Sequence, residues 1–273
     1  MNEKIIAVMT CYNRMNKTFN SIINLMDNPG INISFVVVDD NSSDGTEEML
    51  NSLKRQYDIH IIRGNGSLFY TGGMRKGLDY VLKNFDDYNY ILLCNDDVEF
   101  HPGAITKLTK ESEEKDAVIV GVCCSNKGTM TYSAVSYPKG FSIQYSRLPL
   151  GFCESADTFC ANCVLIPKHI FKTVGNMDGH YSHSFGDFDY GLMIRKKGYN
   201  IYTSSDYIGI CEWNSKEKTW RDKNLSRIDR IRKKENVKGL PFKEWFYFLN
   251  KNFGLLKAVI YSCTPYLKII LKK

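Results

Sequence analysis

The sequence lacks any long hydrophobic segment. None of its uninterrupted apolar runs approaches the roughly 20 residues that cross a bilayer. The first apolar run, residues 5–9, is too short for a signal peptide and its cleavage site. Internal repeats and low-complexity tracts are absent too, which excludes solenoid and disordered chains. We therefore expect a globular protein that works in the cytoplasm.

A disulfide framework is also lacking. The nine cysteines are an odd number, and several lie inside apolar runs, as Cys94, Cys123 and Cys124 do. Such scattered cysteines are typical of reduced thiols in the cytosol. The Cys-x-x-Cys pair at Cys160 and Cys163 has no second pair beside it and therefore predicts no zinc site.

Positive charge is missing from most of the chain. Residues 1–221 hold 23 Lys and Arg against 26 Asp and Glu, whereas residues 222–273 hold 13 against 4. This distribution argues against nucleic acid as a partner and favours a tail that meets an anionic surface. We expect one globular domain over residues 1–221 and a basic, aromatic extension over 222–273.

Strand-like and helix-like segments alternate through the first half of the chain. The strands are expected at 5–9, 35–38, 59–63 and 91–94, then at 117–122 and 164–166; the helices at 19–26, 47–53 and 75–84, then at 170–174 and 189–197. Continuous apolar strands between helices predict an α/β fold, a mostly parallel sheet flanked by helices. Ligands of such sheets bind beyond the carboxyl ends of the strands.

Acidic residues follow two of the expected strands, at Asp39-Asp40 and at Asn95-Asp96-Asp97. Adjacent carboxylates repel each other, and Mg²⁺ shared with substrate phosphates would relieve that repulsion. A solvent-facing helix cap is the alternative for Asp96-Asp97. An Asx-turn with an N-cap is the alternative for Asp39-Asp40, although Asp44 and Thr46 could supply that cap alone. Since a ribose or a pyrimidine needs carboxylate acceptors, the two pairs together favour a nucleotide site.

Glycines gather between the third strand and the third helix. Gly64-Asn65-Gly66 and Gly72-Gly73 could let the backbone approach a phosphate, with Arg75 favouring the anion. The third glycine of a dinucleotide-binding fingerprint is missing.

A further acidic site is Asp187-Phe188-Asp189, at the start of an expected helix. One of its carboxylates could deprotonate an acceptor hydroxyl; the alternative is an N-cap with a first-turn acid. His180 and His183 lie nearby and could touch acceptor or phosphate, or could be loop residues without a role.

Four segments together carry a family resemblance. They are Thr10–Arg14, Val38–Thr46, Asn95–Asp97 and Gly186–Leu192. In order and spacing the chain resembles, over about residues 4–215, family 2 glycosyltransferases of the GT-A fold (Rossmann-like), especially bacterial polysaccharide and rhamnosyltransferase-like members. The resemblance implies a divalent metal, Mn²⁺ or Mg²⁺, and a nucleoside-diphosphate sugar donor.

The resemblance also implies roles for single residues. Thr10, Tyr12 and Asp40 would contact the nucleobase, with Asp39 close by, and Asp96 would lie near the ribose. The glycine-rich passage described above adds Arg75 to this nucleotide-binding set. Asp97 would bind the metal, with Asn95 as a weaker ligand. Asp187 matches the catalytic base, while Asp189, His183 and Arg195 would lie on the acceptor side.

This sequence departs from the family pattern at three places. Asn95 replaces the first acid of the Asp-x-Asp motif, and Gly186 stands where many members have an acid before the base. Many members also carry a later histidine near the metal, where this chain has Cys211. A thiolate suits Mg²⁺ or Mn²⁺ poorly, so no ligand is assigned there.

A base facing a metal-bound diphosphate predicts single displacement with inversion at the anomeric carbon. The expected donor carries UDP or dTDP, and the expected acceptor is a glycan or a polyprenyl-diphosphate-linked glycan in surface polysaccharide synthesis, such as capsule or O-antigen. A catalytically weak nucleotide- or glycan-binding module is one rival. A sugar-1-phosphate nucleotidyltransferase is another, but it needs a glycine-rich loop after the first strand, and residues 10–14 contain no glycine.

The tail mixes aromatic residues with lysines. Lys257, Pro265 and Lys268 interrupt any membrane span, so an interfacial helix pair on anionic lipid, at the inner face of the plasma membrane, is expected. The alternative is that these aromatics pack on the catalytic domain or on a second subunit of a homodimer.

Overall fold

The computed structural model describes residues 3–152 and 154–271. Its centre is an eight-stranded sheet. In sheet order the strands are β3 (Ile59–Arg63), β2 (Ile31–Asp39), β1 (Glu3–Cys11), β4 (Tyr90–Cys94), β10 (Cys163–Pro167), β6 (Val118–Cys124), β11 (Ile201–Ile210) and β5 (Glu99–Phe100). Only β10 and the edge strand β5 run antiparallel to their neighbours. The predicted, mostly parallel sheet is confirmed.

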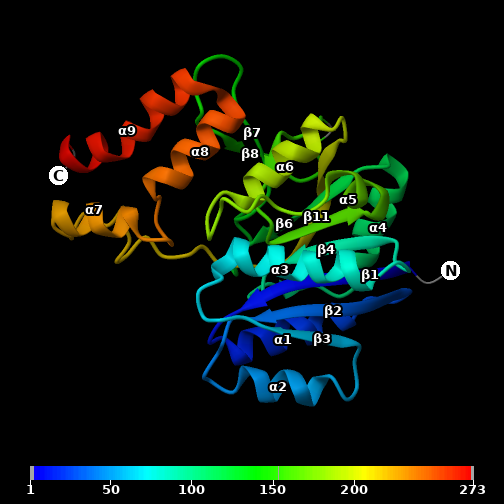
Figure 1. Cartoon of the computed structure of the whole chain (residues 1–273). Coiled ribbons are helices and arrows are strands. Elements are labelled where there is room, and N and C mark those ends of the chain that lie inside the picture. Colours follow the sequence, from blue (N-terminus) through cyan, green and yellow to red (C-terminus); the bar gives the residue numbers. More distant parts are fainter. Residues whose placement is uncertain (1–2, 153, 272–273) are drawn as a thin grey trace.

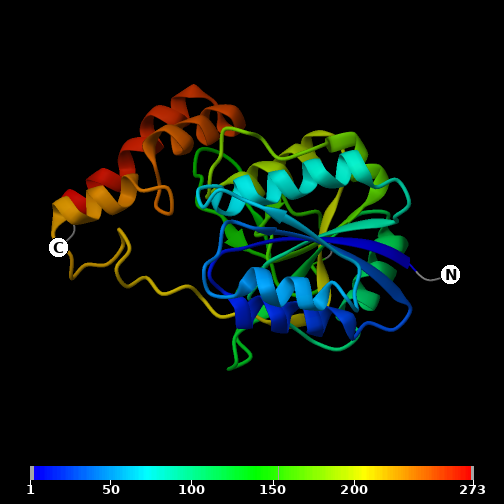
Figure 2. The ribbon, with the colours of Figure 1, turned by 60° about the horizontal axis from the view of Figure 1, so that its bottom comes forward.

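Helices cover both faces of this sheet (Figures 1 and 2). One face carries α1 (Met15–Met26), α2 (Thr46–Leu53) and α4 (Ala104–Lys115), and the other carries α3 (Phe69–Asn84), α5 (Lys168–Val174) and α6 (Gly186–Lys196). The two helical layers explain why residues 5–9 of β1 form an unbroken apolar run. Ile5, Ala7 and Met9 belong to one core cluster, and Ile6 and Val8 to the other. The side chains of residues 5–9 are therefore buried whichever face they point to.

A smaller sheet stands beside the central one. It contains β7 (Ala134–Ser136), β8 (Ser146–Arg147) and β9 (Thr158–Phe159), in the order β8-β7-β9. The loop between β7 and β8, residues 137–145, reaches toward the C-terminal helices, since Phe141 and Tyr261 lie 5.7 Å apart between ring centroids. This loop forms part of the site described below.

Helix α3 begins six residues earlier than the expected start at Arg75, so Gly72-Gly73 is helical and is no loop. Close packing on the sheet explains these glycines. A Cβ on Gly73 would lie 2.3 Å from Thr10 Oγ1, and one on Gly77 would lie 2.7 Å from Val8 Cγ1. Gly72-Gly73 thus forms no phosphate loop, because both residues are inside α3, and Gly73 with Gly77 lets α3 approach β1 closely.

Three helices follow the sheet: α7 (Arg227–Glu235), α8 (Phe242–Phe253) and α9 (Leu255–Leu271). Figure 1 shows α8 and α9 beyond the end of the sheet that lies opposite the N-terminus, where the parallel strands finish. Phe248 and Leu249 of α8 form a third core cluster with Tyr181, against which Phe185 and Phe188 pack. The aromatic residues of α8 thus pack on the N-terminal domain, as one of the two sequence alternatives had it.

Helix α9 contains the apolar surface that this packing leaves uncovered. Leu256, Val259, Ile260 and Leu267 are exposed, whereas Ala258 and Ile269 are buried. Within the described part of the chain, no helix combines the length and the apolar character that crossing a bilayer requires.

Candidate functional site

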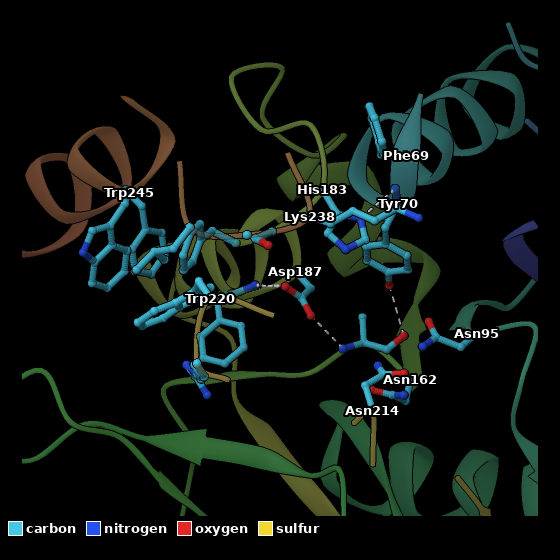
Figure 3. Close-up of a pocket in the computed structure, with 18 of the residues that line it drawn as sticks. Phe69, Tyr70, Asn95, Asn162, His183, Asp187, Asn214, Trp220, Lys238 and Trp245 are labelled. Carbon is cyan, nitrogen blue, oxygen red and sulfur yellow. Dashed lines mark hydrogen bonds between the residues drawn. The ribbon is translucent and has the colours of Figure 1, made fainter. Parts of the chain in front are cut away.

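A cavity of about 1250 Å³ opens at the carboxyl ends of the parallel strands. Its walls include the ends of β1, β2 and β4, the start of α3, the start of α6 with the loop before it, the loop between β7 and β8, and the C-terminal extension. Figure 3 shows Asp187 in the middle of this cavity, with Trp220 and Trp245 on one side and Tyr70 and Asn95 on the other. Its position agrees with the rule that ligands of open α/β sheets bind beyond the strand ends.

Asp40 orders the loop between β3 and α3. Its Oδ1 accepts a hydrogen bond from Gly66 N at 2.8 Å, and its Oδ2 accepts from Leu68 N at 2.9 Å and from Phe69 N at 3.1 Å. A Cβ on Gly64 would lie 2.4 Å from Asp40 Oδ1, so this glycine makes room for the carboxylate. Asp40 lines the cavity, and its contact with a nucleobase stays a prediction.

Asp39, unlike Asp40, does not line the cavity. It is buried, and its Oδ1 accepts from the backbone N–H of Ser42 at 3.1 Å and from the Ser42 hydroxyl. Asp39 therefore orders the start of the loop that follows β2, and the Asx-turn considered as an alternative is made by Asp44, whose Oδ1 accepts from Thr46 N at 3.2 Å. The cavity is lined instead by the neighbouring Thr10 and by the half-exposed ring of Tyr12, both assigned to the nucleobase from the sequence.

The acidic end of the cavity has a cation that the sequence analysis did not assign to the site. Arg14 Nη1 lies 3.1 Å from Asp96 Oδ1 and 2.8 Å from Asp97 Oδ2. Burial raises the pKa of Asp96 to about 6, although Arg14 acts in the opposite direction. Arg14 and Asp96 are 82 residues apart in sequence, and only the adjacency of β1 and β4 brings them together.

The oxygens at this end fit a hard divalent cation. Asn95 Oδ1 and Asp96 Oδ2 are buried and have no hydrogen-bond partner among the described residues. Mg²⁺ takes such oxygens together with substrate phosphates. Burial raises the pKa of the Cys211 thiol to about 12, and this thiol lies 3.9 Å from Asp97 Oδ1, to which it donates. Within residues 3–152 and 154–271, no three His, Cys, Asp or Glu side chains gather as a metal site.

Asp187 lies in the first turn of α6 and points into the cavity (Figure 3). Its Oδ2 accepts from Ala161 N at 3.2 Å, and its Oδ1 accepts from Phe188 N at 2.9 Å. Burial raises the pKa of Asp187 to about 6, which outweighs these two hydrogen bonds. A carboxylate with a pKa near neutrality is suited to accept a proton.

The structure explains why a glycine precedes this base. A Cβ on Gly186 would lie 2.1 Å from Thr71 Cγ2, and the Thr71 hydroxyl donates to His183 O at 2.9 Å. The acid that many family members have at this position has no room here. His183 itself lines the cavity, and burial, helped by the charges of Lys238 and Arg14, lowers its pKa to about 4. Its imidazole is therefore neutral at pH 7.

Three further residues assigned from the sequence lie outside the cavity lining. Asp189 is fully buried and accepts from Lys251 Nζ at 2.7 Å and from Asn252 Nδ2 at 2.8 Å. Arg195 donates from Nη1 to Tyr199 O at 2.8 Å, at the far end of α6.

Arg75, the third of them, projects beside Gly179, where a Cβ would lie 2.7 Å from Arg75 Nη1. Helix geometry explains all three positions. Asp189 is about 200° around α6 from Asp187, and Arg195 is about two turns further along. Arg75 similarly lies more than one turn inside α3.

The sequence analysis did not predict that the C-terminal extension supplies one wall of the cavity. It contains Lys238, Trp245, Tyr261 and Lys268, with Trp220 just before the extension. The aromatic and basic composition of this segment indicated a surface for lipid, and no local pattern indicated that one side of it would line the site.

Comparisons with known proteins agree with this geometry. A model of the family described as "Glycosyl transferase family 2" matches residues 5–175. A curated relative, an uncharacterized protein of Methanocaldococcus jannaschii, is 27% identical over 115 residues, which make up 41% of this chain and 48% of that protein. The chain thus spans about half the length of this relative.

Two solved structures share the fold. A mannosyltransferase from Pyrobaculum calidifontis, in complex with GDP-Man and Mn²⁺, has a TM-score of 0.63 at 12% identity, covering 99% of this chain and 74% of that one. TarS of S. aureus, residues 1–349, has a TM-score of 0.58 at 11% identity, covering 98% and 81%. At such identities the likeness shows the fold alone. Because the family model matches more than half of the chain, the chain belongs to glycosyl transferase family 2, and its structure has the GT-A fold.

Proposed function

We propose that this protein is an inverting, metal-dependent glycosyltransferase that moves a sugar from a nucleoside diphosphate to a hydroxyl of a glycan or lipid-linked glycan. The observation that carries the proposal is the position of Asp187. A carboxylate of raised pKa faces a cavity whose other end holds Asp96, Asp97 and Arg14. Base and leaving-group site thus lie on two sides of one space, as a single displacement requires.

The donor end is supported by the oxygens and the guanidinium around Asp97. A divalent ion there, Mn²⁺ or Mg²⁺, would be held by Asp97 and Asn95 and would neutralise the departing diphosphate. The mannosyltransferase from P. calidifontis was solved with GDP-Man and Mn²⁺, which supports a nucleotide sugar as donor here. UDP or dTDP stays our prediction for the nucleotide.

The reaction then follows from the residues of this chain. Asp187 accepts the proton of the acceptor hydroxyl, whose oxygen forms a bond to the anomeric carbon. The bond from that carbon to the diphosphate oxygen breaks, and its electron pair leaves with the diphosphate. The guanidinium of Arg14 lies where this negative charge develops. Attack opposite to the leaving group inverts the anomeric configuration. Neutral His183 accepts from Tyr70 N at 3.4 Å through Nδ1, so its Nε2–H can donate a hydrogen bond to the acceptor without carrying a charge at pH 7.

We further propose that α9 and α7 hold the protein on an anionic membrane surface, the inner face of the plasma membrane. Six exposed apolar residues of α9 form one stripe with helical spacing: Leu256, Val259, Ile260, Leu267, Ile270 and Leu271. Exposed Leu255 lies beside it. Helix α7 lies alongside α9 (Figure 2), joined to it by Lys234, whose Nζ is 3.9 Å from the ring centroid of Tyr266. Exposed Arg227 and Arg232 on α7 supply the basic side of the same surface.

Cosedimentation with vesicles tests the membrane proposal. Wild type should pellet with vesicles of phosphatidylglycerol and phosphatidylcholine, and Leu256→Glu/Ile260→Glu should stay in the supernatant. Leu82→Glu, an exposed leucine on α3, is the matched control. If the double variant still pellets, the proposal fails. If the wild-type protein does not bind vesicles but forms a dimer through this stripe, the homodimer alternative is favoured instead.

A thermal-shift screen tests the donor site. Nucleoside diphosphates and nucleotide sugars are added with and without Mn²⁺ to wild type and to Asp97→Ala. A metal-dependent rise in melting temperature with one nucleotide, absent in Asp97→Ala, is expected, because a ligand stabilises the state that binds it. No shift with any nucleotide would contradict the proposal and favour a module that binds glycan alone.

A further inference from the structure

The charges that line the cavity are segregated. Its acidic residues, Asp40, Asp96, Asp97 and Asp187, all come from the N-terminal domain, and among the described lining residues after position 187 every charged side chain is a cation. Arg14 is the cation of the donor end, where it is paired with two carboxylates. The other cations of the lining are Arg147, Arg221, Lys238 and Lys268.

These four cations lack carboxylate partners. Within residues 3–152 and 154–271, no salt bridge involves Arg147, Arg221, Lys238 or Lys268. The Nε of Arg147 is buried without a hydrogen-bond partner, while its guanidinium stacks 4.3 Å from the ring centroid of Trp213. A buried donor without a partner is costly, and an anionic ligand that accepts from this Nε–H would remove that cost. The stacking holds Arg147 in place before the ligand arrives.

Arg147 and Arg221 lie away from the donor end, whereas Lys238 lies between, since its charge and that of Arg14 both lower the pKa of His183. In Figure 3, Trp220 lies on the other side of Asp187 from Asn95, and Arg221 stacks on Trp220 at 5.1 Å from its ring centroid. The charges of Arg147 and Arg221 both lower the pKa of Tyr145, whereas the charges that shift the pKa of Asp96 are those of Arg14 and Asp97. Arg147 and Arg221 are therefore near Tyr145, and Arg14 is near Asp96. An anion bound by Arg147 and Arg221 would therefore sit across Asp187 from the donor diphosphate.

Helix α9 connects this cationic wall to the exposed apolar stripe. Tyr261, Thr264, Pro265 and Lys268 line the cavity and follow the spacing i, i+3, i+4 and i+7. The exposed apolar residues of α9 lie roughly 130° around the same helix. A ligand with a phosphate in the cavity and an apolar chain beyond it would therefore contact two faces of one helix.

We propose that Arg147, Arg221 and Lys238 form a subsite for a phosphate or diphosphate group on the acceptor, with Lys268 at its rim. This assignment rests on the proposed function, since it takes Asp96 and Asp97 as the donor end. The anion fixes the acceptor so that its sugar hydroxyl reaches Asp187. Neutral glycans of the same sugar lack that anchor and bind weakly.

The test measures binding, so it does not depend on turnover. Farnesyl diphosphate is the probe, and the intrinsic fluorescence of Trp220 and Trp245 in the cavity wall is the readout. Wild type should bind it, and Arg221→Gln/Lys238→Gln should bind it about tenfold or more weakly, since hydrogen bonds between cations and phosphate are strong. Lys223→Gln/Lys243→Gln removes two charges outside the cavity lining and should bind as wild type does. Farnesol should not bind to any of them.

Two further arms locate the anion and identify its source. Arg14→Gln, at the donor end, should leave the affinity for farnesyl diphosphate unchanged. If Arg14→Gln loses binding while Arg221→Gln/Lys238→Gln keeps it, the proposal is overturned. Inorganic pyrophosphate competing at similar concentration would show that the anion alone is recognised, and much weaker competition would show that the lipid chain contributes. Equal binding by all variants, or no binding to wild type, also overturns it. Failure of the nucleotide screen with intact probe binding would refute the donor site alone.

Discussion

Lys251 holds the C-terminal extension on the domain that carries the base. Its Nζ lies 2.7 Å from Asp178 Oδ2 and 2.7 Å from Asp189 Oδ2. The Asp189 side chain is 0% exposed, that of Asp178 15% and that of Lys251 26%. We predict that Lys251→Met, which keeps most of the aliphatic stem, destabilises the protein because it leaves a buried carboxylate without its cation.

The size of the effect follows from the burial. Breaking a buried ion pair from one side costs about 3–5 kcal/mol. Asp189 keeps two donors, Asn252 Nδ2 at 2.8 Å and the Tyr181 hydroxyl at 3.2 Å, so the lower end applies. We expect the free energy of unfolding to fall by about 3 kcal/mol. Asp189→Asn added to Lys251→Met should recover part of that loss, since it removes the unpaired charge.

Urea denaturation followed by tryptophan fluorescence measures this change, with Trp245 of α8 as a local reporter. Lys243→Met, an exposed lysine on the same helix, is the matched control and should change stability by less than about 0.5 kcal/mol. If Lys251→Met proves as stable as Lys243→Met, the extension is not held by this ion pair and the reasoning is refuted.

Three other predictions concern the site. Because Asp187 must be ionised to accept a proton and burial raises its pKa to about 6, kcat should fall tenfold per pH unit below that value; a pH–rate profile flat from pH 5 to 7 would exclude it as the base. Gly186→Glu, which restores the residue common in the family, should lose about 1–3 kcal/mol in urea denaturation, because its Cβ would lie 2.1 Å from Thr71 Cγ2; unchanged stability would contradict the close packing. Arg14→Met should weaken nucleotide-sugar binding in calorimetry by about tenfold, and an unchanged Kd would show that Arg14 does not contact the diphosphate.

The parallel half of the fold was predictable because its signals are local. Strands buried on both faces appear in the sequence as apolar runs. The acidic residues at the carboxyl ends of β2 and β4 lie on the same side of the sheet, because both strands pair in parallel with β1. The positions of Asp40, Asp96 and Asp97 follow from that topology. The register of the sheet brings Arg14 to the same edge, although nothing near Arg14 in the sequence indicates its partners.

Other parts of the site depend on helical phase and on distant contacts. Asp187 and Asp189 look equivalent in sequence, yet one points into the cavity and the other beneath the extension. Lys257 on α9 donates to Gly140 O, a contact between residues 117 positions apart. Such contacts depend on how the extension folds back over the domain, which composition does not encode. The division at residues 221 and 222 stays a prediction.

The central claim is that Asp187 is the base of a sugar transfer. Its most direct test is the single-turnover rate of transfer from the nucleotide sugar found in the thermal-shift screen, in wild type and in Asp187→Asn. We predict a loss of about 10²–10⁴ in rate, with the Kd for the nucleotide unchanged because Asp187 lies across the cavity from Asp97. A variant that transfers sugar within tenfold of the wild-type rate would contradict the account.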